Sequence, residues 1–402
     1  MISRDAFALA LIALVPLLLP FSRMAELPIM LGALVGVYAL VQNGRQLWND
    51  APARALGFAL GLYSFAALIS AIDAVDPEKS WTTAIASLRL GLYALAVRWL
   101  LMGARSHRLM ALAAALPIAL WTLDGAAQAL TGYSLGGPLD ADRLSGIFGA
   151  DDLKLGPLLP ALAPLLLWPL LDRCIAAPTA GRIAFLMSVY LLLALVVLLA
   201  GARAGWVSFA LATMLMALRL AQHSMRLTVW IAAGALVVVG AISGIAYQQS
   251  EHFRARVDRT LEFRSGNADH ALAGRLPIWR TAGAMIAAHP VNGVGVRSFR
   301  FAYPDFAATD DPWVDPSGTH GAAHAHQILL ELLSETGVIG LCCWLLAGWS
   351  LWRLRRGALP GAAAALLVLT FPLNTHLAFY SSFMGIVLAW LVALQGVREG
   401  PR

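Results

Sequence analysis

The sequence predicts an all-α, polytopic integral membrane protein. Hydrophobic residues make up 59% of the 402 residues, charged residues make up only 13%, and the mean hydropathy is +0.71. A soluble globule has too little interior to cover so much apolar surface. Apolar runs recur along the whole chain, and a helix of about 20 residues is long enough to cross the apolar core of a bilayer. The sequence therefore predicts a bundle of about twelve membrane spans.

The expected spans, in chain order, are Phe7–Leu19, Leu27–Val41, Ala53–Ile72, Thr82–Leu101, Leu109–Leu130, Leu155–Leu171, Ile183–Ala200, Gly205–Leu220, Leu227–Tyr247, Gln327–Trp352, Ala358–Pro372 and Leu377–Leu394. The first run also has the character of a secretory signal. No clear cleavage site of small residues follows Leu19, however, and the second run begins within a few residues. We therefore expect the first run to remain as a membrane anchor.

Arginines in the short loops set the expected orientation, because basic loops stay in the cytoplasm. One alternating set of loops carries these arginines: Arg45, Arg54, Arg105, Arg108, Arg173, Arg182, Arg219, Arg226, Arg353, Arg355 and Arg356, with Arg398 and Arg402 in the tail. Most of the opposite loops are poor in basic residues. Both termini are therefore expected in the cytoplasm.

Two outward segments are longer than the others and divide the chain. Residues 1–247 are expected to form nine spans with a smaller outward loop near 132–154. Residues 248–325 are expected to form a large, mostly helical outward cap, and residues 326–402 the last three spans. Long loops are translocated despite their charge, so the basic residues of this cap do not change the orientation.

Helical patterns predict the internal structure of the cap. One helix is expected at Glu251–Phe263, and a second from about Gly274 to Ala288. The second should end at His289-Pro290, because proline cannot continue a helix. Aromatic residues between Phe299 and Trp313 predict an ordered cap rather than a disordered linker.

Arg203, Arg275 and His326 are the leading candidates for a functional site, because ionisable groups beside membrane spans are costly. Each also has a plainer interpretation when it is taken alone. Arg203 would extend to the lipid headgroups, Arg275 would be solvated, and His326 would form a hydrogen bond at a helix end. Taken together, the three residues favour a functional site over these plainer interpretations.

Three motifs together resemble those of O-antigen ligases. They are Arg203-Ala-Gly-Trp206, Gly274-Arg275-x-x-x-x-Trp279 before His289-Pro290-x-x-Gly293-x-Gly295, and His326-Gln327 followed after nine residues by Gly337-Val-Ile-Gly340. The segment Arg143-Leu-Ser-Gly146-Ile-Phe-Gly149 resembles a motif that O-antigen polymerases and protein O-oligosaccharyltransferases share with the ligases. In motif content, the resemblance runs from about Arg143 to Gly340.

This resemblance implies a GT-C-like glycosyltransferase of the bacterial inner membrane, with its active site facing the periplasm. It implies that an O-antigen polysaccharide passes from undecaprenyl diphosphate to a sugar of the lipid A core, with inversion. Because arginines can supply the positive charge, we expect the reaction to need no metal or other cofactor. An O-antigen polymerase that uses the same lipid carrier is the alternative within the superfamily. A flippase or transporter of lipid-linked oligosaccharides is the alternative outside it, although we find no pair of similar halves typical of transporters.

The candidate residues suit that chemistry. Guanidinium groups bind phosphate oxygens in pairs, so Arg203 and Arg275 are expected to stabilise the departing diphosphate, with Arg143 and Lys154 as weaker candidates. His326 is expected to remove the proton of the attacking sugar hydroxyl.

Neighbouring residues are expected to support His326. Gly337 and Gly340, deeper in the same span, should let another helix pack closely and fix its position. His324 is a candidate contact for the acceptor, and helix geometry should point it away from His326.

Two other kinds of site are not expected. Asp310, Asp311 and Asp315, together with His320 and His324, suggest an outward metal site, but their spacing matches no standard pattern of ligands. The net charge of +6 does not imply nucleic-acid binding, because membrane topology accounts for most cytoplasmic arginines. The expected partners are the lipid-linked polysaccharide, the lipid A core oligosaccharide and membrane lipids.

Overall fold

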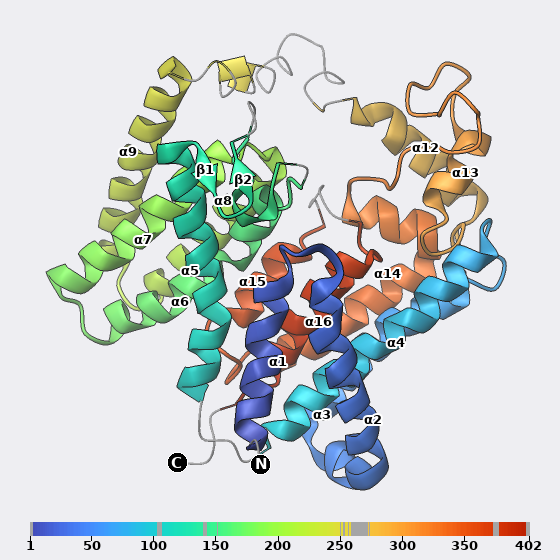
Figure 1. The fold of residues 1–402 in the computed structure, drawn as a ribbon, viewed down its shortest axis with the longest axis horizontal. Coiled ribbons are helices and arrows are strands. Elements are labelled where there is room, and N and C mark those ends of the chain that lie inside the picture. Colours follow the sequence, from blue (N-terminus) through green and yellow to red (C-terminus); the bar gives the residue numbers. More distant parts are fainter. Residues whose placement is uncertain are drawn as a thin grey trace.

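The chain forms an α-helical bundle (Figure 1). The computed structural model describes residues 3–102, 107–139, 143–150, 152–249, 274–372 and 378–398, with a few residues between 251 and 272. The helices are α1 (Arg4–Leu18), α2 (Glu26–Asn49), α3 (Ala51–Ser70), α4 (Pro77–Leu100), α5 (His107–Thr131), α6 (Leu155–Ala176), α7 (Ala180–Leu199), α8 (Arg203–Ala221), α9 (Met225–Gln249), α12 (Arg275–Ala288), α13 (Phe299–Phe306), α14 (Ile328–Leu354), α15 (Ala362–Leu369) and α16 (Ser382–Gln395). Strands β1 (Tyr133–Ser134) and β2 (Gly137–Pro138) form a small antiparallel hairpin after α5. Short 3-10 turns occupy Ser22–Ala25 and Gly146–Phe148.

The predicted class, an all-α polytopic membrane protein, is confirmed. Within the described residues, eight helices are long and apolar enough to cross a membrane: Arg23–Asn49, which includes α2, together with α3, α4, α5, α6, α7, α8 and α14. Helix α16 and the Met225–Ala241 part of α9 are apolar but shorter. Helix α15 has only eight residues, or about 12 Å of helix, so the span expected at Ala358–Pro372 is not one continuous crossing helix. The total of twelve spans stays a prediction.

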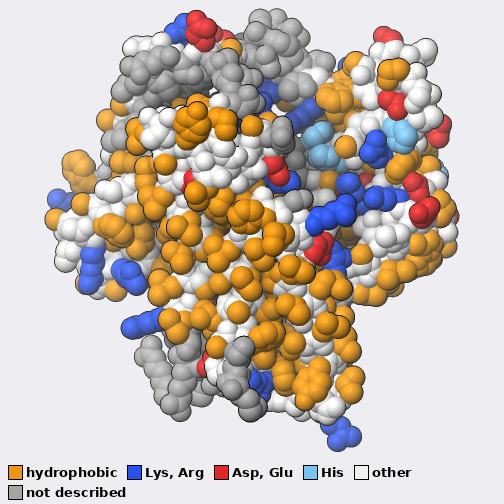
Figure 2. All heavy atoms as spheres, viewed as in Figure 1, with side chains coloured by type: hydrophobic (Ala, Val, Ile, Leu, Met, Phe, Trp, Pro, Cys, Tyr) orange, Lys and Arg blue, Asp and Glu red, His pale blue; other side chains and the backbone are white. Residues whose placement is uncertain are grey.

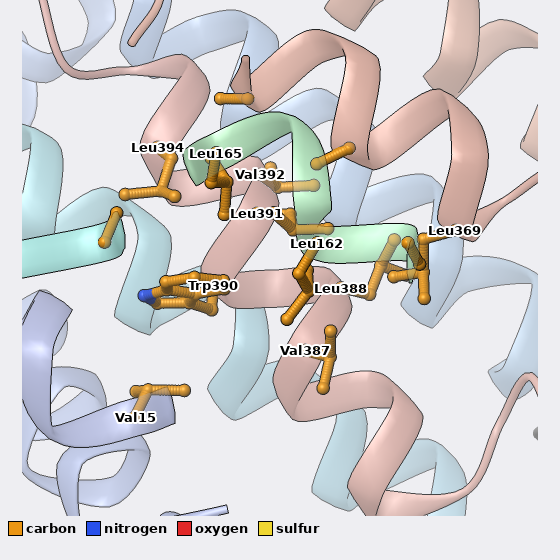
Figure 3. Packing of buried hydrophobic residues seen from close by; sticks show 14 of the residues in the cluster. Val15, Leu162, Leu165, Leu369, Val387, Leu388, Trp390, Leu391, Val392 and Leu394 are labelled. Carbon is orange, nitrogen blue, oxygen red and sulfur yellow. The ribbon is translucent and has the colours of Figure 1, made fainter. Parts of the chain in front are cut away.

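Helix α16 lies at the centre of the bundle. Every residue from Met384 to Gln395 is buried, as expected of a helix that is apolar on all its faces. Figure 3 shows Trp390 among leucines and valines of α16, with Val15 of α1 on one side and leucines of α6 and α15 nearby. The Trp390 indole N–H donates to the Ile12 carbonyl at 2.9 Å, so its polar atom is satisfied within the core. Helices α1, α3, α4, α14 and α15 all contact α16.

Arginine contacts close one end of the bundle, which we call the basal end. Arg98 binds the Asp50 carboxylate through two nitrogens, at 2.7 and 2.8 Å, and donates to the Gly396 carbonyl at 3.0 Å. Arg4 donates to the Trp99 carbonyl at 2.6 Å. These contacts place the start of α1, the α2–α3 turn, the end of α4 and the residue after α16 at the same end (Figure 1).

The opposite end carries α12 and α13, and we call it the cap end (Figure 1). The segment between these helices docks on the α3–α4 turn. The Val75 N–H donates to the Val294 carbonyl at 3.0 Å, and the Ser80 hydroxyl donates to the Val296 carbonyl at 2.8 Å. Helix α12 confirms the predicted helix and its end at His289-Pro290. The other helix expected in the cap, Glu251–Phe263, lies largely outside the described residues.

Helix α14 is broken at Gly337, where φ is 61° and ψ is −162°. The cap segment 290–295 meets the helix at this break. Backbone hydrogen bonds join the two segments in both directions: Val338 N–H to the Pro290 carbonyl at 2.9 Å, Ile339 N–H to the Val291 carbonyl at 3.2 Å, Val294 N–H to the Ser334 carbonyl at 2.8 Å and Gly295 N–H to the Glu335 carbonyl at 3.1 Å. The broken helix and the irregular segment thereby satisfy each other's peptide groups.

This break corrects the role expected for Gly337 and Gly340. We expected both glycines to admit a second helix, but a Cβ atom at Gly337 would lie 2.2 Å from the Val291 carbonyl oxygen. Gly337 therefore admits the backbone of the cap segment. At Gly340 the space for a Cβ atom is filled by the side chain of Thr336, one turn earlier on the same helix. The pattern reflects an irregular backbone contact rather than the packing of two helices.

The substitution Gly293→Ala tests this junction. Gly293 has a φ of 71°, and a Cβ atom there would lie 2.3 Å from the Glu335 carbonyl carbon. We expect a loss of about 2–4 kcal/mol in stability, because the left-handed backbone and the displaced main chain both add cost. Thermal unfolding in detergent measures it. Gly283→Ala in α12, where a Cβ atom meets open space, should leave the midpoint unchanged or higher. Equal midpoints for the two variants would contradict the prediction.

Candidate functional site

Arg275 is fixed at the start of α12 by a tryptophan from the following loop. The helix begins after Gly274, whose φ is 71°, and the Trp313 indole N–H donates to the Gly274 carbonyl at 2.7 Å. Burial lowers the pKa of Arg275, and the nearby charge of Arg203 lowers it further. An arginine side chain does not lose its proton at neutral pH, so the guanidinium stays charged.

Arg203 is the first residue of α8. Two residues later, a Cβ atom on Gly205 would lie 2.2 Å from the Gly156 carbonyl oxygen of α6, so the backbones of α6 and α8 touch. The first turns of both helices therefore lie side by side. Helix N-termini carry partial positive charge, which adds to that of Arg203.

The charge of Arg203 thus acts on Arg275, although the two residues are about 70 positions apart in the chain. Like charges in a half-buried place repel each other, and an anion between them would relieve that repulsion. Figure 2 shows the face of the molecule that is also seen in Figure 1. On its upper part, Lys, Arg and His side chains gather between the α5–α9 side of the molecule and the α12–α13 side. The arrangement suits the binding of an anionic group.

His326 and His324 lie immediately before α14, and their rings are in contact. The ring centroids are 3.9 Å apart, with an angle of 45° between the planes. The expectation that His324 points away from His326 is therefore wrong. It assumed helical geometry, but α14 begins only at Ile328, and His326 has a left-handed φ of 52°. A non-glycine residue in this conformation is a frequent feature of functional sites.

Contacts on both sides hold the backbone of His326. The Trp279 indole N–H donates to the Ala325 carbonyl at 3.1 Å, and the Gln327 side chain caps α14 by accepting the Leu330 N–H at 2.5 Å. Trp279 lies four residues after Arg275 in α12, and residues at this spacing share a helix face. The face of α12 that carries Arg275 is therefore the face that meets the segment before α14.

The two weaker phosphate candidates are placed differently. Lys154 precedes α6 and forms an ion pair with Asp152 at 2.5 Å, and its Nζ also lies 4.4 Å from the centre of the Phe383 ring. Arg143 lies beside the end of α7, because the Leu144 N–H donates to the Leu199 carbonyl at 3.5 Å. Of these two residues, Lys154 has its charge partly neutralised, by the Asp152 carboxylate of the same loop.

The acidic loop residues have other partners in the structure. Asp311 accepts the Tyr303 hydroxyl at 3.0 Å. Burial alone raises the pKa of Asp315, but hydrogen bonds from the backbone of His320 and Thr319 and from the Ser317 hydroxyl lower it to about 2. Within the described residues, no group of three or more His, Cys, Asp and Glu side chains is arranged to hold a metal ion.

Sequence reasoning missed a buried acidic pair, Glu331 and Glu335, one turn apart in α14. Both side chains are at most 1% exposed, and Glu331 accepts the Phe379 N–H at 2.6 Å. The charge of Arg297, a residue with a φ of 63°, acts on both carboxylates. Two carboxylates four residues apart in an apolar run were a visible signal. Glu331 ties the segment before α16 to the outer part of α14.

Sequence reasoning also missed Gln128, a fully buried residue of α5. Its side-chain oxygen accepts the Ser145 N–H at 3.0 Å and the Gly146 N–H at 2.8 Å. One amide group thereby shapes the loop that carries Arg143. A single glutamine within an apolar run was the available signal.

Comparison with known families addresses the same region. Residues 188–345 match the family model described as O-antigen ligase. The chain carries an O-antigen ligase family domain. This domain begins within α7, ends within α14 and contains Arg203, Arg275 and His326, whereas Arg143 and Lys154 precede it. The predicted resemblance is confirmed. No curated protein matches the chain.

The hydrogen bond from Trp279 within the O-antigen ligase domain leads to a testable prediction. Trp279→Phe keeps an aromatic ring but leaves the buried Ala325 carbonyl without its indole donor. We expect stability to fall by about 1–3 kcal/mol, and amide exchange to rise at residues 325–328. Thermal unfolding and hydrogen exchange measure these effects. Trp230→Phe, at a site 69% exposed, should change neither. Unchanged exchange at 325–328 would show that Trp279 does not hold this segment.

Proposed function

We propose that the protein is an O-antigen ligase that transfers a polysaccharide from undecaprenyl diphosphate to a sugar hydroxyl of the lipid A core. The observation that carries the proposal is the O-antigen ligase domain at residues 188–345, which contains Arg203, Arg275 and His326. The domain supports membership of a superfamily of ligases and polymerases that act on lipid-linked polysaccharides. The His326-to-Gly340 pattern favours the ligase.

The arginine pair suits the leaving group of the reaction. When the bond between the anomeric carbon and the diphosphate breaks, negative charge grows on the phosphate oxygens. Two guanidinium groups and the first turn of α8 supply positive charge at that place before the reaction starts. Because guanidinium groups bind two oxygens at once, they also orient the diphosphate.

His326 suits the acceptor side of the reaction. As the sugar hydroxyl attacks the anomeric carbon, its proton passes to an imidazole nitrogen of His326, and the diphosphate departs from the opposite face. The configuration at that carbon is therefore inverted. His326 then releases the proton to solvent. We assign to His324, whose ring contacts that of His326, a contact with the acceptor.

The proposed topology follows from the loop arginines. The basal end faces the cytoplasm and carries both termini, and the cap end faces the periplasm in the bacterial inner membrane. Residues 248–325 form the periplasmic cap between the helices of residues 1–247 and those of residues 326–402. We place the meeting point of the substrates at the cap end, between the first turn of α8 and α12.

A reconstituted transfer assay tests the function. Purified protein is incubated with lipid-linked polysaccharide and a lipid A core acceptor in excess EDTA, and the products are separated by size. We expect a high-mass ladder on the acceptor. Elongated lipid-linked chains would instead identify a polymerase. Activity that is lost in EDTA and restored by Mg²⁺ or Mn²⁺ would overturn the metal-independent mechanism.

Conservative substitution of the two arginines tests their role. Arg203→Lys and Arg275→Lys keep the charge but cannot bind phosphate bidentately, so each should reduce transfer by roughly 10²-fold. Membrane yield and thermal stability should stay close to those of the wild type. Arg280→Lys, on the exposed side of α12, is the matched control and should retain full transfer. Near-normal activity of both test variants would remove the pair from the mechanism.

Substitution of His326 separates a base from a structural residue. His326→Gln and His326→Asn keep a hydrogen-bonding side chain but take up no proton near neutral pH, and Asn tolerates a left-handed φ well. Each should lose roughly 10²–10⁴-fold in transfer, and donor binding should persist because the arginines remain. Transfer is measured against pH, with His223→Gln at the exposed α8–α9 turn as the control. A folded variant with most of the wild-type activity would show that His326 is not the base.

A further inference from the structure

A groove at the basal end lies apart from the proposed active site. It has a volume of about 830 Å³ and lies between α2, the first turns of α3 and the last turns of α14, with Leu95 of α4 in its wall. Helix α2 departs from regular geometry at Asn43, where φ is −132°, and its last turns form one wall. The ion pair between Asp50 and Arg98 fixes the α2–α3 turn beside the groove.

The lining combines an apolar surface with two cations. Most lining side chains are aliphatic or aromatic, and they include Leu40, Leu47, Trp48, Phe58, Leu95 and Trp349. Among the described residues that line the groove, the ionisable ones are Arg54 and Arg353, and neither Asp nor Glu lines it. The lining of the groove is therefore both apolar and positively charged.

Each arginine is held beside a tryptophan. Arg54 donates to the Trp48 carbonyl at 2.5 Å, and the Arg353 guanidinium carbon lies 5.0 Å from the centre of the Trp349 ring. Trp48 is 73% exposed and Trp349 is 57% exposed. Tryptophan and arginine at the ends of membrane helices mark the level of the lipid headgroups. Helices α2, α3, α4 and α14 are all candidate spans, so the groove opens at that boundary.

The lining chemistry selects one kind of occupant. A small soluble anion would contact the arginines but leave the apolar wall exposed to water. A neutral apolar chain would cover the wall and leave both cations without a counter-charge. An amphipathic anion satisfies both parts, because its charged head meets the arginines and its acyl chain covers the leucines.

We propose that this groove binds an anionic phospholipid. Its phosphate lies between Arg54 and Arg353, and one acyl chain lies along the apolar wall that contains Leu40, Leu47 and Leu95. The site is separate from the proposed transferase site, since it lies at the C-terminal end of α14 and His326 precedes the N-terminal end.

Native mass spectrometry tests the proposal. Purified protein in detergent is titrated with phosphatidylglycerol or phosphatidylcholine that carry the same palmitoyl and oleoyl chains. We expect retention of phosphatidylglycerol with clear preference. The double variant Arg54→Gln/Arg353→Gln should bind it at least tenfold more weakly, because each near-surface arginine contributes roughly fivefold. The double variant Arg108→Gln/Arg226→Gln removes two arginines outside the groove lining and should bind as the wild type does.

A second pair of variants keeps every charge and changes only the shape of the groove. Gly44 lines the groove, and a Cβ atom there meets open space, so Gly44→Phe should fold and fill the apolar part. It should reduce retention of phosphatidylglycerol by a similar factor. Gly234→Phe in α9, which also has open space around it, is the matched control and should have no effect.

Several outcomes would overturn the proposal. Equal retention of the two lipids would show that charge does not select the occupant. Equal loss in both arginine double variants would indicate a general surface effect. Displacement of the lipid by inorganic phosphate would identify a site for a free anion. A change from dimer to monomer in Gly44→Phe, with lipid retention unchanged, would assign the groove to a second copy of the chain.

Discussion

The junction between the broken helix α14 and the cap segment 290–295 is the contact on which the candidate site depends. A helix that breaks at Gly337 leaves peptide groups without intrahelical hydrogen-bond partners. The irregular segment also has peptide groups that lack partners within the segment. Each segment supplies the partners of the other, so neither is stable in this conformation alone. Helix α12 leads directly into segment 290–295, and hydrogen bonds join this segment to α14. The junction therefore fixes the position of α12 relative to α14.

Single polar side chains hold the rest of the irregular backbone around the site. The indole of Trp313 fixes the start of α12, the indole of Trp279 fixes the backbone before His326, and Glu331 fixes Phe379 before α16. Each hydrogen bond adds only about 1 kcal/mol net, yet its loss leaves a buried group unsatisfied at about 1–3 kcal/mol. These anchors therefore act on local geometry more than on total stability.

Arginines have different roles in different surroundings. At the basal end Arg98 is bound to Asp50 and to a carbonyl, and it closes the bundle. At the cap end the charge of Arg203 acts on Arg275. An ion pair stabilises the free protein, whereas two neighbouring cations favour the state in which an anion is bound.

The sequence by itself determined the class of fold, the helix that Arg275 opens and its end at Pro290, because hydropathy, helical spacing and proline act locally. It also singled out Arg203, Arg275 and His326 by their residue types and motifs. Only the tertiary structure decided the contact between the rings of His324 and His326 and the break at Gly337. It also decided the hydrogen bond from Trp279 to the Ala325 carbonyl. Trp279 and Ala325 are 46 positions apart, and Gly337 meets a segment more than 40 positions earlier. Such contacts satisfy buried backbone groups of one segment with those of another, and no local pattern specifies which distant segment will supply the partner.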